Sequence, residues 1–452
     1  MKTSTINPSS LFSSKSYSFG KLHNGRNHSN YFKHCKSGLS PIFFIWSIGL
    51  TAIFCFFLLC PPNPLRFSSK QQQKQQHLSP IARASIKPQS GAEKCDLFKG
   101  KWVPDLNGSQ YTSTSCVTIP DSKNCFKHGR LDRDFVNWRW KPDNCELPKF
   151  NPHKFLHVVG GKKLAFIGDS VARNHMESLL CLLSQVETPV DVYKDSEDRF
   201  RTWHFPSSNF TLMIFWTKFL VQSKEIMVNN TGTGSFNLHF DKIDEKWASK
   251  LPTLDYVIIS DAHWFFRKNY LYNENKLIGC VYCNEPNITE LGLNYALRMS
   301  FRAALKQINN CKNCKKGMVT LVRTFSPAHF ENGAWDTGGG CNRTSPHAIE
   351  KAKELEKRYE YELDLRKLQM EEVDRARKEG LGQAKVFRAL DVTWPMLMRP
   401  DGHPGEFWGN KWMKGYNDCV HWCMPGPIDV WSDFLLAVLQ KEISSSYKHT
   451  AR

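Results

Sequence analysis

Short apolar runs that alternate with helical stretches after residue 163 are the feature that most limits the fold of this chain. Five of these runs have the length and composition of buried strands: 164–167, 212–215, 256–259, 319–322 and 386–390. Helical patterns occupy 172–184, 290–308, 348–378 and 428–440, and we expect the heavily charged faces of 348–378 to be solvated. Strand and helix in alternation predict an α/β fold whose mostly parallel sheet is covered by helices on both faces.

An uninterrupted apolar run at 42–60 carries no charge and is long enough to span a bilayer. Six Lys and Arg and no acidic residue precede it, and no small-residue cleavage site follows, so we interpret the run as an uncleaved signal anchor. The next stretch is rich in Gln, Ser, Pro and Lys, a composition typical of disorder. The sequence predicts a cytosolic tail (1–41), a transmembrane anchor (42–60), a disordered stem (61–94), a Cys- and Trp-rich segment (95–150) and a main α/β domain (151–445).

Cysteines and glycosylation sequons both indicate an oxidising lumen for the part of the chain after the anchor. Twelve cysteines follow residue 60, an even number that suits disulfides: Cys95, Cys116, Cys125, Cys145, Cys181, Cys280, Cys283, Cys311, Cys314, Cys341, Cys419 and Cys423. Asn-x-Ser/Thr sequons in the same part of the chain make five asparagines candidates for N-glycosylation: Asn107, Asn209, Asn229, Asn287 and Asn342.

Two Cys-x-x-Cys pairs, Cys280 with Cys283 and Cys311 with Cys314, also have a zinc interpretation. The interval between the pairs exceeds the usual zinc-ribbon spacing, and an oxidising compartment favours disulfides. We therefore predict disulfides and no metal.

The formal net charge of +18 raises the question of nucleic acid. Much of this excess lies in residues 1–94, where 12 Lys and Arg accompany a single acid, Glu93. The remainder of the chain is only mildly basic and has no basic stripe with interleaved aromatics, so no nucleic-acid partner is expected.

Gly168-Asp169-Ser170 follows an apolar strand and immediately precedes a predicted helix. A serine at such a turn lies at the carboxyl edge of the sheet, where free N–H groups of the helix N-terminus can stabilise an oxyanion. The tripeptide is also common in ordinary turns, so a structural serine is the alternative interpretation.

Asp418-x-x-His421 supplies the other half of a possible triad. An Asp three residues before a His on one turn can accept from its Nδ1–H and leave Nε2 free to take a proton from a serine. Two alternatives stay open: a surface histidine beside a capping Asp, and a metal site formed by Cys419, His421 and Cys423.

Several separate motifs together resemble the plant trichome birefringence-like family over residues 95–440. They are Trp138-Arg139-Trp140, Gly168-Asp169-Ser170 with Arg173-Asn174 and Glu177-Ser178-Leu179, Arg399-Pro400-Asp401-Gly402-His403-Pro404, and Asp418-x-x-His421-Trp422-Cys423-x-Pro425-Gly426. The resemblance implies an SGNH/GDSL-esterase-like three-layer sandwich and a Golgi polysaccharide O-acetyltransferase. The stretches 170–178, 263–267 and 323–331 most resemble the xyloglucan-modifying branch, in which galactose or glucose hydroxyls are acetylated.

The same resemblance assigns roles to single residues. It implies Ser170 as nucleophile, His421 as general base and acid, and Asp418 as the carboxylate that orients His421. Four further residues are candidate substrate or oxyanion contacts: Gly168, Arg173, Asn174 and His263. One position departs from the family pattern, because Ala262 replaces a Gly before His263, which puts an oxyanion contribution from that loop in doubt and leaves His263 either structural or functional. Arg399 and His403 lie in a loop rich in Gly and Pro, and we expect them to hold the last motif in place. The resemblance also implies that eight cysteines form the framework that clamps the amino-terminal segment to the catalytic edge: Cys95, Cys116, Cys125, Cys145, Cys181, Cys341, Cys419 and Cys423.

The activity that follows is a two-step acetyl transfer through an acetyl-serine. A polysaccharide acetylesterase with the same triad and a noncatalytic glycan-binding protein are the alternatives. Trp138, Trp140 and Trp264 are candidates either for sugar stacking or for packing. No bound cofactor is expected; the acetyl donor is a co-substrate, acetyl-CoA or an acetylated intermediate, and a membrane partner is expected to deliver it at the Golgi membrane.

Overall fold

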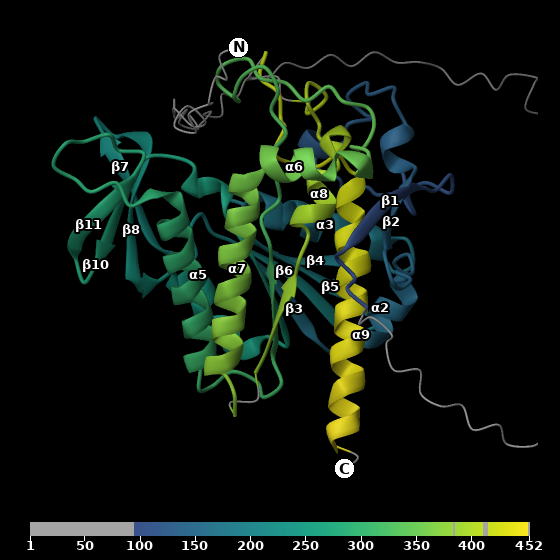
Figure 1. Ribbon diagram of the computed structural model, residues 1–452. Helices are drawn as coiled ribbons and strands as arrows, with labels where there is room; N and C mark the ends of the chain where they lie inside the picture. Colours follow the sequence, from purple (N-terminus) through teal and green to yellow (C-terminus); the bar gives the residue numbers. More distant parts are fainter. Residues whose placement is uncertain (1–94, 383–384, 410–414, 451–452) are drawn as a thin grey trace, which may run out of the picture. The chain divides into compact units, whose positions relative to one another are not determined.

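The computed structural model describes residues 95–382, 385–409 and 415–450 (Figure 1). The predicted tail, anchor and stem lie outside these residues. Among the helices of the described part, none is long and apolar enough to cross a membrane.

A seven-stranded sheet with the order β13-β12-β9-β3-β6-β5-β4 forms the centre of the fold (Figure 1). Neighbours from β13 to β6 pair in parallel, whereas β5 and β4 pair antiparallel at one edge. The strands are β3 (Lys163–Gly168), β4 (Val190–Lys194), β5 (Phe200–Phe205), β6 (Phe210–Trp216), β9 (Tyr256–Ser260), β12 (Val319–Arg323) and β13 (Val386–Leu390). The five predicted strands are the five parallel ones, and the two additional strands make the sheet mixed.

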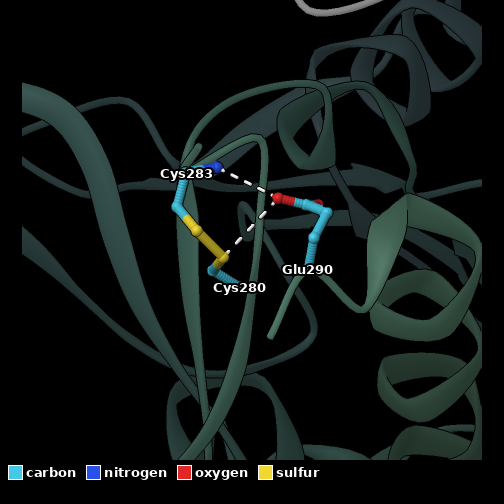
Figure 2. Close-up of side chains that lie close together, drawn as sticks. All are labelled: Cys280, Cys283 and Glu290. Atoms are coloured by element: carbon cyan, nitrogen blue, oxygen red, sulfur yellow. Dashed lines mark hydrogen bonds between the residues drawn. A yellow bond between two sulfur atoms is a disulfide. The ribbon is translucent and has the colours of Figure 1, made fainter. Parts of the chain in front are cut away.

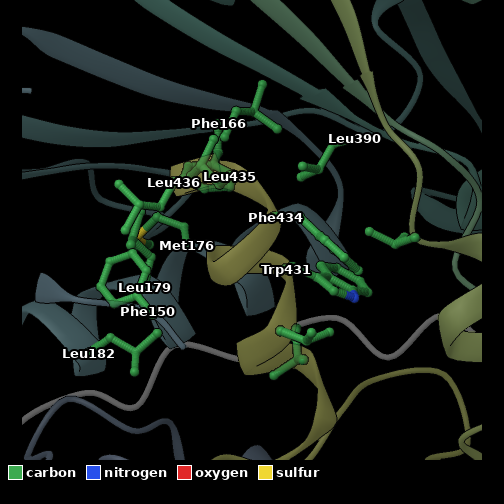
Figure 3. Close-up of a cluster of buried hydrophobic side chains, with 14 of the residues drawn as sticks. Phe150, Phe166, Met176, Leu179, Leu182, Leu390, Trp431, Phe434, Leu435 and Leu436 are labelled. Carbon is green, nitrogen blue, oxygen red and sulfur yellow. The ribbon is translucent and has the colours of Figure 1, made fainter. Parts of the chain in front are cut away.

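Alternate side chains of β3 face two different cores. Leu164 and Phe166 pack with α2 (Pro152–Val158), α3 (Ser170–Ser184), α8 (Thr393–Leu397) and α9 (Val430–Thr450), as Figure 3 shows in part. Ala165 and Ile167 pack on the other side with α4 (Glu245–Ala248), α5 (Gly292–Asn310) and α7 (Glu360–Glu379). Each fully buried Leu or Phe contributes about 1.5–3 kcal/mol, so the strands are held from both faces and the carboxyl edge of the sheet is fixed.

A second sheet of four strands, in the order β11-β10-β8-β7, was not predicted. It consists of β7 (Val221–Val228), β8 (Thr231–Ile243), β10 (Asn269–Asn273) and β11 (Lys276–Val281). Burial alternates along β8, so this strand has no continuous apolar run. Two turn pairs at positive φ, Asn229-Asn230 and Glu274-Asn275, mark its hairpins. These are the local signals by which the sheet could have been found.

The predicted helix 348–378 divides at Tyr359 into α6 (Ala352–Arg358) and α7. Its charged faces are not all solvated. Glu372 is 1% exposed and accepts hydrogen bonds at 2.7 Å from Arg302 of α5 and from Arg375. Burial alone would raise the pKa of Glu372, but these two arginines lower it below its usual value. The prediction of a solvated helix was therefore wrong at this position, because an ion cluster joins α7 to α5.

All twelve predicted cysteines form disulfides, which confirms that prediction and supplies the pairing. The pairs are Cys95–Cys145, Cys116–Cys181, Cys125–Cys423, Cys280–Cys283, Cys311–Cys314 and Cys341–Cys419. Two of them, Cys116–Cys181 and Cys125–Cys423, attach the amino-terminal segment to the main domain.

The amino-terminal segment contains two antiparallel strands, β1 (Gly100–Pro104) and β2 (Trp138–Pro142), and the chain between them consists of loops and two 3-10 turns. It shares the core of the main domain, since Trp102 and Trp140 belong to the same buried cluster as α3 and α9. Trp102 Nε1 donates to Pro395 O at 2.8 Å, and Phe150 N donates to Asp433 of α9 at 2.8 Å. The segment therefore folds against the main domain and not around a core of its own.

We expect replacement of Asp433 by Asn to stabilise the protein at alkaline pH. Burial raises the pKa of Asp433 to about 8, well above the ordinary value of an aspartate. The folded chain holds this proton more tightly than the unfolded chain, so the associated stability is present at low pH and is lost as pH rises through the folded pKa. Asp433→Asn stays neutral and should raise the melting temperature at pH 8.5 by about 2–4 °C per kcal/mol regained.

Thermal unfolding at pH 5 and pH 8.5 measures this effect. At pH 5 the advantage of the variant should be smaller than at pH 8.5, because the folded Asp433 is still neutral and only the unfolded chain has lost the proton. The exposed Asp143→Asn is the matched control and should follow the parent at both pH values. Equal melting temperatures for Asp433→Asn and the parent at pH 8.5 would contradict the assignment.

Candidate active site

Ser170 is the first residue of α3, directly beyond the carboxyl end of β3. Asp169 caps the helix by accepting from Val171 N at 2.9 Å. Gly168 has φ 151°, and a Cβ at this position would overlap the carbonyl oxygen of Ser260 in β9. Glycine at position 168 therefore lets β3 approach β9 this closely. Ser170 follows at the start of α3, where the first N–H groups have no intrahelical acceptor.

The structure brings Ser170, His421 and Asp418 together. His421 Nε2 lies 2.7 Å from Ser170 Oγ, and His421 Nδ1 lies 2.8 Å from Asp418 Oδ2. The other oxygen of Asp418 accepts from Val420 N at 3.1 Å and His421 N at 3.0 Å. Burial alone would raise the pKa of Asp418, but His421 and these backbone hydrogen bonds hold it below its ordinary value. The carboxylate is anionic and can orient the imidazole.

A buried support holds the main chain at His421. His403 Nδ1 donates to His421 O at 2.6 Å, and its ring stacks on Trp422 with 4.1 Å between ring centres. Burial lowers the pKa of His403 to about 4, so this histidine is neutral near pH 7. Arg399 and Asp401, both inaccessible to solvent, form a two-contact ion pair at 2.8 Å. His403 thus contacts and supports the loop, as the sequence predicted, whereas Arg399 holds Asp401 and donates to Phe135 O of the amino-terminal segment.

Residues 123–130 of the amino-terminal segment also contact the part of the chain that carries His403 and His421. Cys125 is bonded to Cys423, two residues after His421. Lys123 O accepts from Met424 N at 2.8 Å, and Arg130 donates to His403 O at 3.0 Å. Cys341–Cys419 adds a further link beside Asp418. The position of His421 therefore depends on segments far away in the sequence.

Two of the four predicted substrate contacts, Arg173 and Asn174, have side chains that hydrogen-bond to the main chain of the protein itself. Asn174 is fully buried, with its amide oxygen accepting from Trp422 N at 2.8 Å and its amide nitrogen donating to Trp422 O at 3.3 Å. Arg173 donates to the carbonyl oxygens of Asp198 and Arg199. The hydrogen bonds of both side chains thus join α3 to neighbouring loops, and their contact with substrate stays a prediction.

His263 occupies the loop after β9, in a short 3-10 turn (His263–Phe265). His263 is 7% exposed, and its ring stacks on that of Phe325 with 5.1 Å between ring centres. Its Nδ1 lies 3.7 Å from Asp169 Oδ2. Ala262 N and His263 N donate to the same oxygen at 3.2 and 3.1 Å. Ala262 has an extended φ of 179°, which any residue adopts. The N–H group of Ala262 is used by Asp169, in line with the doubt about an oxyanion contribution from this position.

A buried charge cluster behind Ser170 was missed by sequence reasoning. Asp169, Asp261 and Arg323 are all inaccessible to solvent, and Arg323 Nε donates to Ser260 Oγ at 2.8 Å. Burial lowers the pKa of Arg323 to about 10, so it remains a cation near neutral pH. Burial, together with the charge of Asp169, raises the pKa of Asp261. A charged residue at the end of the apolar run 319–322 was the available signal, because buried charges need partners.

A hollow of about 380 Å³ opens at the carboxyl end of β6, the strand next to β3, and Ser170 itself does not line it. Trp216 lies in its wall and pairs with Gly168 across β6 and β3, while Thr217 N donates to Gly168 O at 2.8 Å. Lys218, also in the wall, lies 4.5 Å from the ring centre of Trp264, and Arg267 lies 4.0 Å from it. Cations therefore pack on both tryptophans, since Arg199 also lies 5.2 Å from the ring centre of Trp216, but of the two it is Trp216 that borders the hollow.

The two other tryptophans singled out from the sequence lie in β2 of the amino-terminal segment. Trp140 is 1% exposed, and its Nε1 donates to Leu97 O at 2.9 Å. Trp138 is half-buried and packs at the edge of the same core. Trp140 is therefore a packing residue.

Both metal interpretations conflict with the cysteine pairing. Cys419 and Cys423 are bonded to Cys341 and Cys125, so neither thiolate is available to join His421 as a ligand. Figure 2 shows the Cys280–Cys283 disulfide with Glu290 beside it. Glu290 accepts from Tyr282 N at 2.9 Å and Cys283 N at 3.2 Å, which makes it a cap of this tight loop.

The five sequon asparagines are all exposed: Asn107, Asn209, Asn229, Asn287 and Asn342. Asn342 follows Cys341, whose disulfide partner Cys419 adjoins Asp418. All five asparagines are thus accessible at the surface.

A serine at a strand-to-helix turn, with an Asp–His pair at hydrogen-bond distance on an α/β fold, defines a serine-dependent acyl-transfer protein. Residues 147–438 match PC-esterase, the GDSL/SGNH-like acyl-esterase family found in Pmr5 and Cas1p, and residues 93–146 match the PMR5 N-terminal domain. The chain belongs to the PC-esterase family.

Three relatives illustrate the similarity. Xyloglucan O-acetyltransferase 4 of Populus trichocarpa is 60% identical over 394 residues, which cover 87% of this chain and 91% of that protein. Xyloglucan O-acetyltransferase 2 of Arabidopsis thaliana is 54% identical over 400 residues, 88% of this chain and 92% of that protein. Protein trichome birefringence-like 19 of Arabidopsis thaliana is 42% identical over 414 residues, 90% and 94% respectively. The resemblance to the trichome birefringence-like family is confirmed.

Removal of the Cys125–Cys423 disulfide should weaken the nucleophile. The double variant Cys125→Ala/Cys423→Ala frees the loop that carries His421, and a misplacement of about 1 Å can cost about 100-fold in rate. We expect labelling of Ser170 by a fluorophosphonate to slow by about tenfold to 100-fold. Cys311→Ala/Cys314→Ala, which opens a link between residues only three apart, is the control and should label like the parent. Parent-like labelling of the first variant would contradict this role.

Proposed function

We propose that this protein is an O-acetyltransferase that transfers acetyl groups to hydroxyls of a plant cell-wall polysaccharide, xyloglucan, through an acetyl-Ser170 intermediate. The observation that carries the proposal is the Ser170–His421–Asp418 geometry in a chain similar to xyloglucan O-acetyltransferases over most of its length. The relatives supply the acceptor class, and the three side chains supply the chemistry.

The proposed first step acylates Ser170. His421 Nε2, 2.7 Å from Ser170 Oγ, takes the hydroxyl proton while Oγ forms a bond to the acetyl carbonyl carbon of the donor. Collapse of the tetrahedral intermediate breaks the bond to the donor's leaving group, which takes the proton from His421. Asp418 stabilises the imidazolium that forms between these events.

The second step runs the same sequence with the acceptor. His421 takes the proton of a sugar hydroxyl, whose oxygen attacks the acetyl-serine, and Ser170 Oγ leaves with that proton. The hollow of about 380 Å³ at the end of β6 offers space for the acceptor, with the half-buried Trp216, which pairs with Gly168 of β3, as a surface for a sugar ring.

A polysaccharide acetylesterase would use the same triad and is the second candidate. It differs only in that water attacks the acetyl-serine in place of a sugar hydroxyl. The similarity to proteins named as acetyltransferases favours transfer. A glycan-binding protein without catalysis would have no need of three side chains at 2.7 and 2.8 Å.

The proposed location is the Golgi membrane, with the anchor at 42–60 and the catalytic domain in the lumen. Six disulfides and five exposed sequon asparagines support an oxidising, glycosylating compartment. A lumenal site cannot draw on cytosolic acetyl-CoA directly, so the proposal includes a membrane protein that delivers acetyl groups, and no bound cofactor.

Mass spectrometry of xyloglucan oligosaccharides after incubation with the protein and an acetyl donor tests the proposal. The parent should add acetyl groups, and Ser170→Ala should add none, because the nucleophile is absent. The exposed Ser207→Ala is the control and should act like the parent. Net loss of acetyl groups from pre-acetylated oligosaccharide, with none gained, would assign the esterase; no change in either direction would exclude both enzymes.

Replacement of Trp216 by Ala should weaken acceptor binding selectively. Loss of a stacking surface worth about 0.5–1.5 kcal/mol raises the acceptor KM by about twofold to tenfold. The rate of Ser170 acetylation by a small acetyl ester should change little, and Trp216→Phe should restore part of the binding. An unchanged acceptor KM in a folded Trp216→Ala variant would remove Trp216 from the acceptor site.

A further inference from the structure

We propose that His329 is a positioning residue for the catalytic base. Its Nδ1–H donates to His403 and so holds His403 in the tautomer whose own Nδ1–H binds the carbonyl oxygen of His421. This inference rests on the proposed function, and His329 acts on the chemistry at Ser170 only through these two histidines.

Two buried imidazoles lie in series between two main-chain carbonyl oxygens. His329 is 3% exposed and His403 is 2% exposed. His329 Nε2 lies 3.2 Å from Leu397 O, and His329 Nδ1 lies 2.7 Å from His403 Nε2. His403 Nδ1 in turn lies 2.6 Å from His421 O. The three contacts form one chain that ends on the main chain of the catalytic histidine.

Both imidazoles of this chain are neutral near pH 7. Burial, together with the neighbouring His403, lowers the pKa of His329 well below its ordinary value. Burial also lowers the pKa of His403 to about 4, although the charge of Asp418 acts in the opposite direction. Each ring therefore carries a single proton.

A count of protons fixes the direction of the contacts. A carbonyl oxygen only accepts a hydrogen bond, and a neutral imidazole has one N–H and one bare nitrogen. The three contacts would need three N–H groups, but two neutral rings supply two. The contact without a proton is the longest one, between His329 Nε2 and Leu397 O. The two protons then lie on Nδ1 of His329 and on Nδ1 of His403.

The tautomer of His403 matters to the catalytic base. If His403 carried its proton on Nε2, its bare Nδ1 would face His421 O at 2.6 Å, where two lone pairs repel each other. The Nδ1–H of His329 disfavours that tautomer because it donates to the lone pair of His403 Nε2. The carbonyl of His421 thus keeps its donor while the ring of His421 keeps its 2.7 Å contact with Ser170.

The packing around His329 holds its ring in place for this role. The ring lies edge-on to Tyr359, with 5.5 Å between ring centres, and edge-on to Trp422 at 6.1 Å. The main chain makes a separate contact, because His329 N donates to Cys419 O at 3.1 Å. This backbone hydrogen bond does not involve the imidazole, so a change of the side chain alone can isolate the effect of the ring N–H.

The test uses the full chain and measures acetyl-Ser170 formation from p-nitrophenyl acetate by rapid-quench mass spectrometry. His329→Leu fills the space without an N–H, and we expect acylation to slow by about tenfold to 100-fold with little change in KM, because His421 is less well placed. His329→Asn can present an amide N–H at the position of Nδ1 and should regain most of the loss. The control His239→Leu, in β8 of the second sheet, should acylate like the parent.

The parent labelled with ¹⁵N in its histidines gives a second readout that does not depend on activity. A scalar coupling across the N–H···N hydrogen bond should join a protonated Nδ1 to a bare Nε2 at pH 7, and it should vanish in His329→Asn. A proton on the Nε2 side of this bond, or no such coupled pair, would overturn the inference.

Parent-like acylation by a folded His329→Leu variant would also overturn the inference, as would equal losses in the Leu and Asn variants. If His329→Leu does not fold, the coupling in the parent decides. If the parent and Ser170→Ala acylate equally, the proposed function itself fails, whereas the coupling still reports the tautomer of His403. The two failures therefore remain distinct.

Discussion

The covalent link between Cys125 and Cys423 is the constraint on which the site depends. The two halves of the triad are held in different ways. Ser170 is placed by the sheet, through the end of β3 and the start of α3, whereas His421 lies in a loop between 3-10 turns. This loop belongs to no helix or sheet, and its backbone is held by a bridge between Gly405 and Asp418 and by hydrogen bonds at Cys419 O and Cys423 N. The disulfide joins residues 298 apart and, with Met424 N on Lys123 O, fixes the chain just beyond His421. The amino-terminal segment is thus part of the active site's support.

Buried charged residues are a second constraint on the geometry of the site. Asp169, Asp261 and Arg323 lie behind the nucleophile without solvent, and Arg399 with Asp401 lies behind the histidine. Breaking a buried ion pair leaves an uncompensated charge and costs about 3–5 kcal/mol, so each cluster permits few alternative arrangements. Asp169 also accepts hydrogen bonds from three main-chain groups on two loops. One carboxylate therefore sets the geometry of both the helix start and the loop that carries His263.

The same support explains how one triad can serve transfer or hydrolysis. The proton chemistry at Ser170 and His421 is identical for water and for a sugar hydroxyl, so selectivity has to come from the walls of the site. Trp216 and the hollow beside it lie on the β6 side of Ser170, and His263 lies on the β9 side. An acceptor that fills the hollow and excludes water would favour transfer. The brace formed by Arg173 on the 198–199 loop ties this wall to the helix that carries the nucleophile.

The sequence by itself determined the five parallel strands, the helices on both sides and the disulfide chemistry, because buried runs and cysteine counts are local properties. It also indicated Ser170, Asp418 and His421 as candidates, since an Asp three residues before a His can reach it on one turn. It could not join Ser170 to His421, because 251 residues separate them and the link depends on tertiary packing. The second sheet was missed because its strands alternate in burial, and the hydrogen bonds of Asn174 to Trp422 could not be foreseen because they join residues 248 apart. Only the tertiary structure decided which polar side chains donate to the protein's own backbone and which remain available to a substrate.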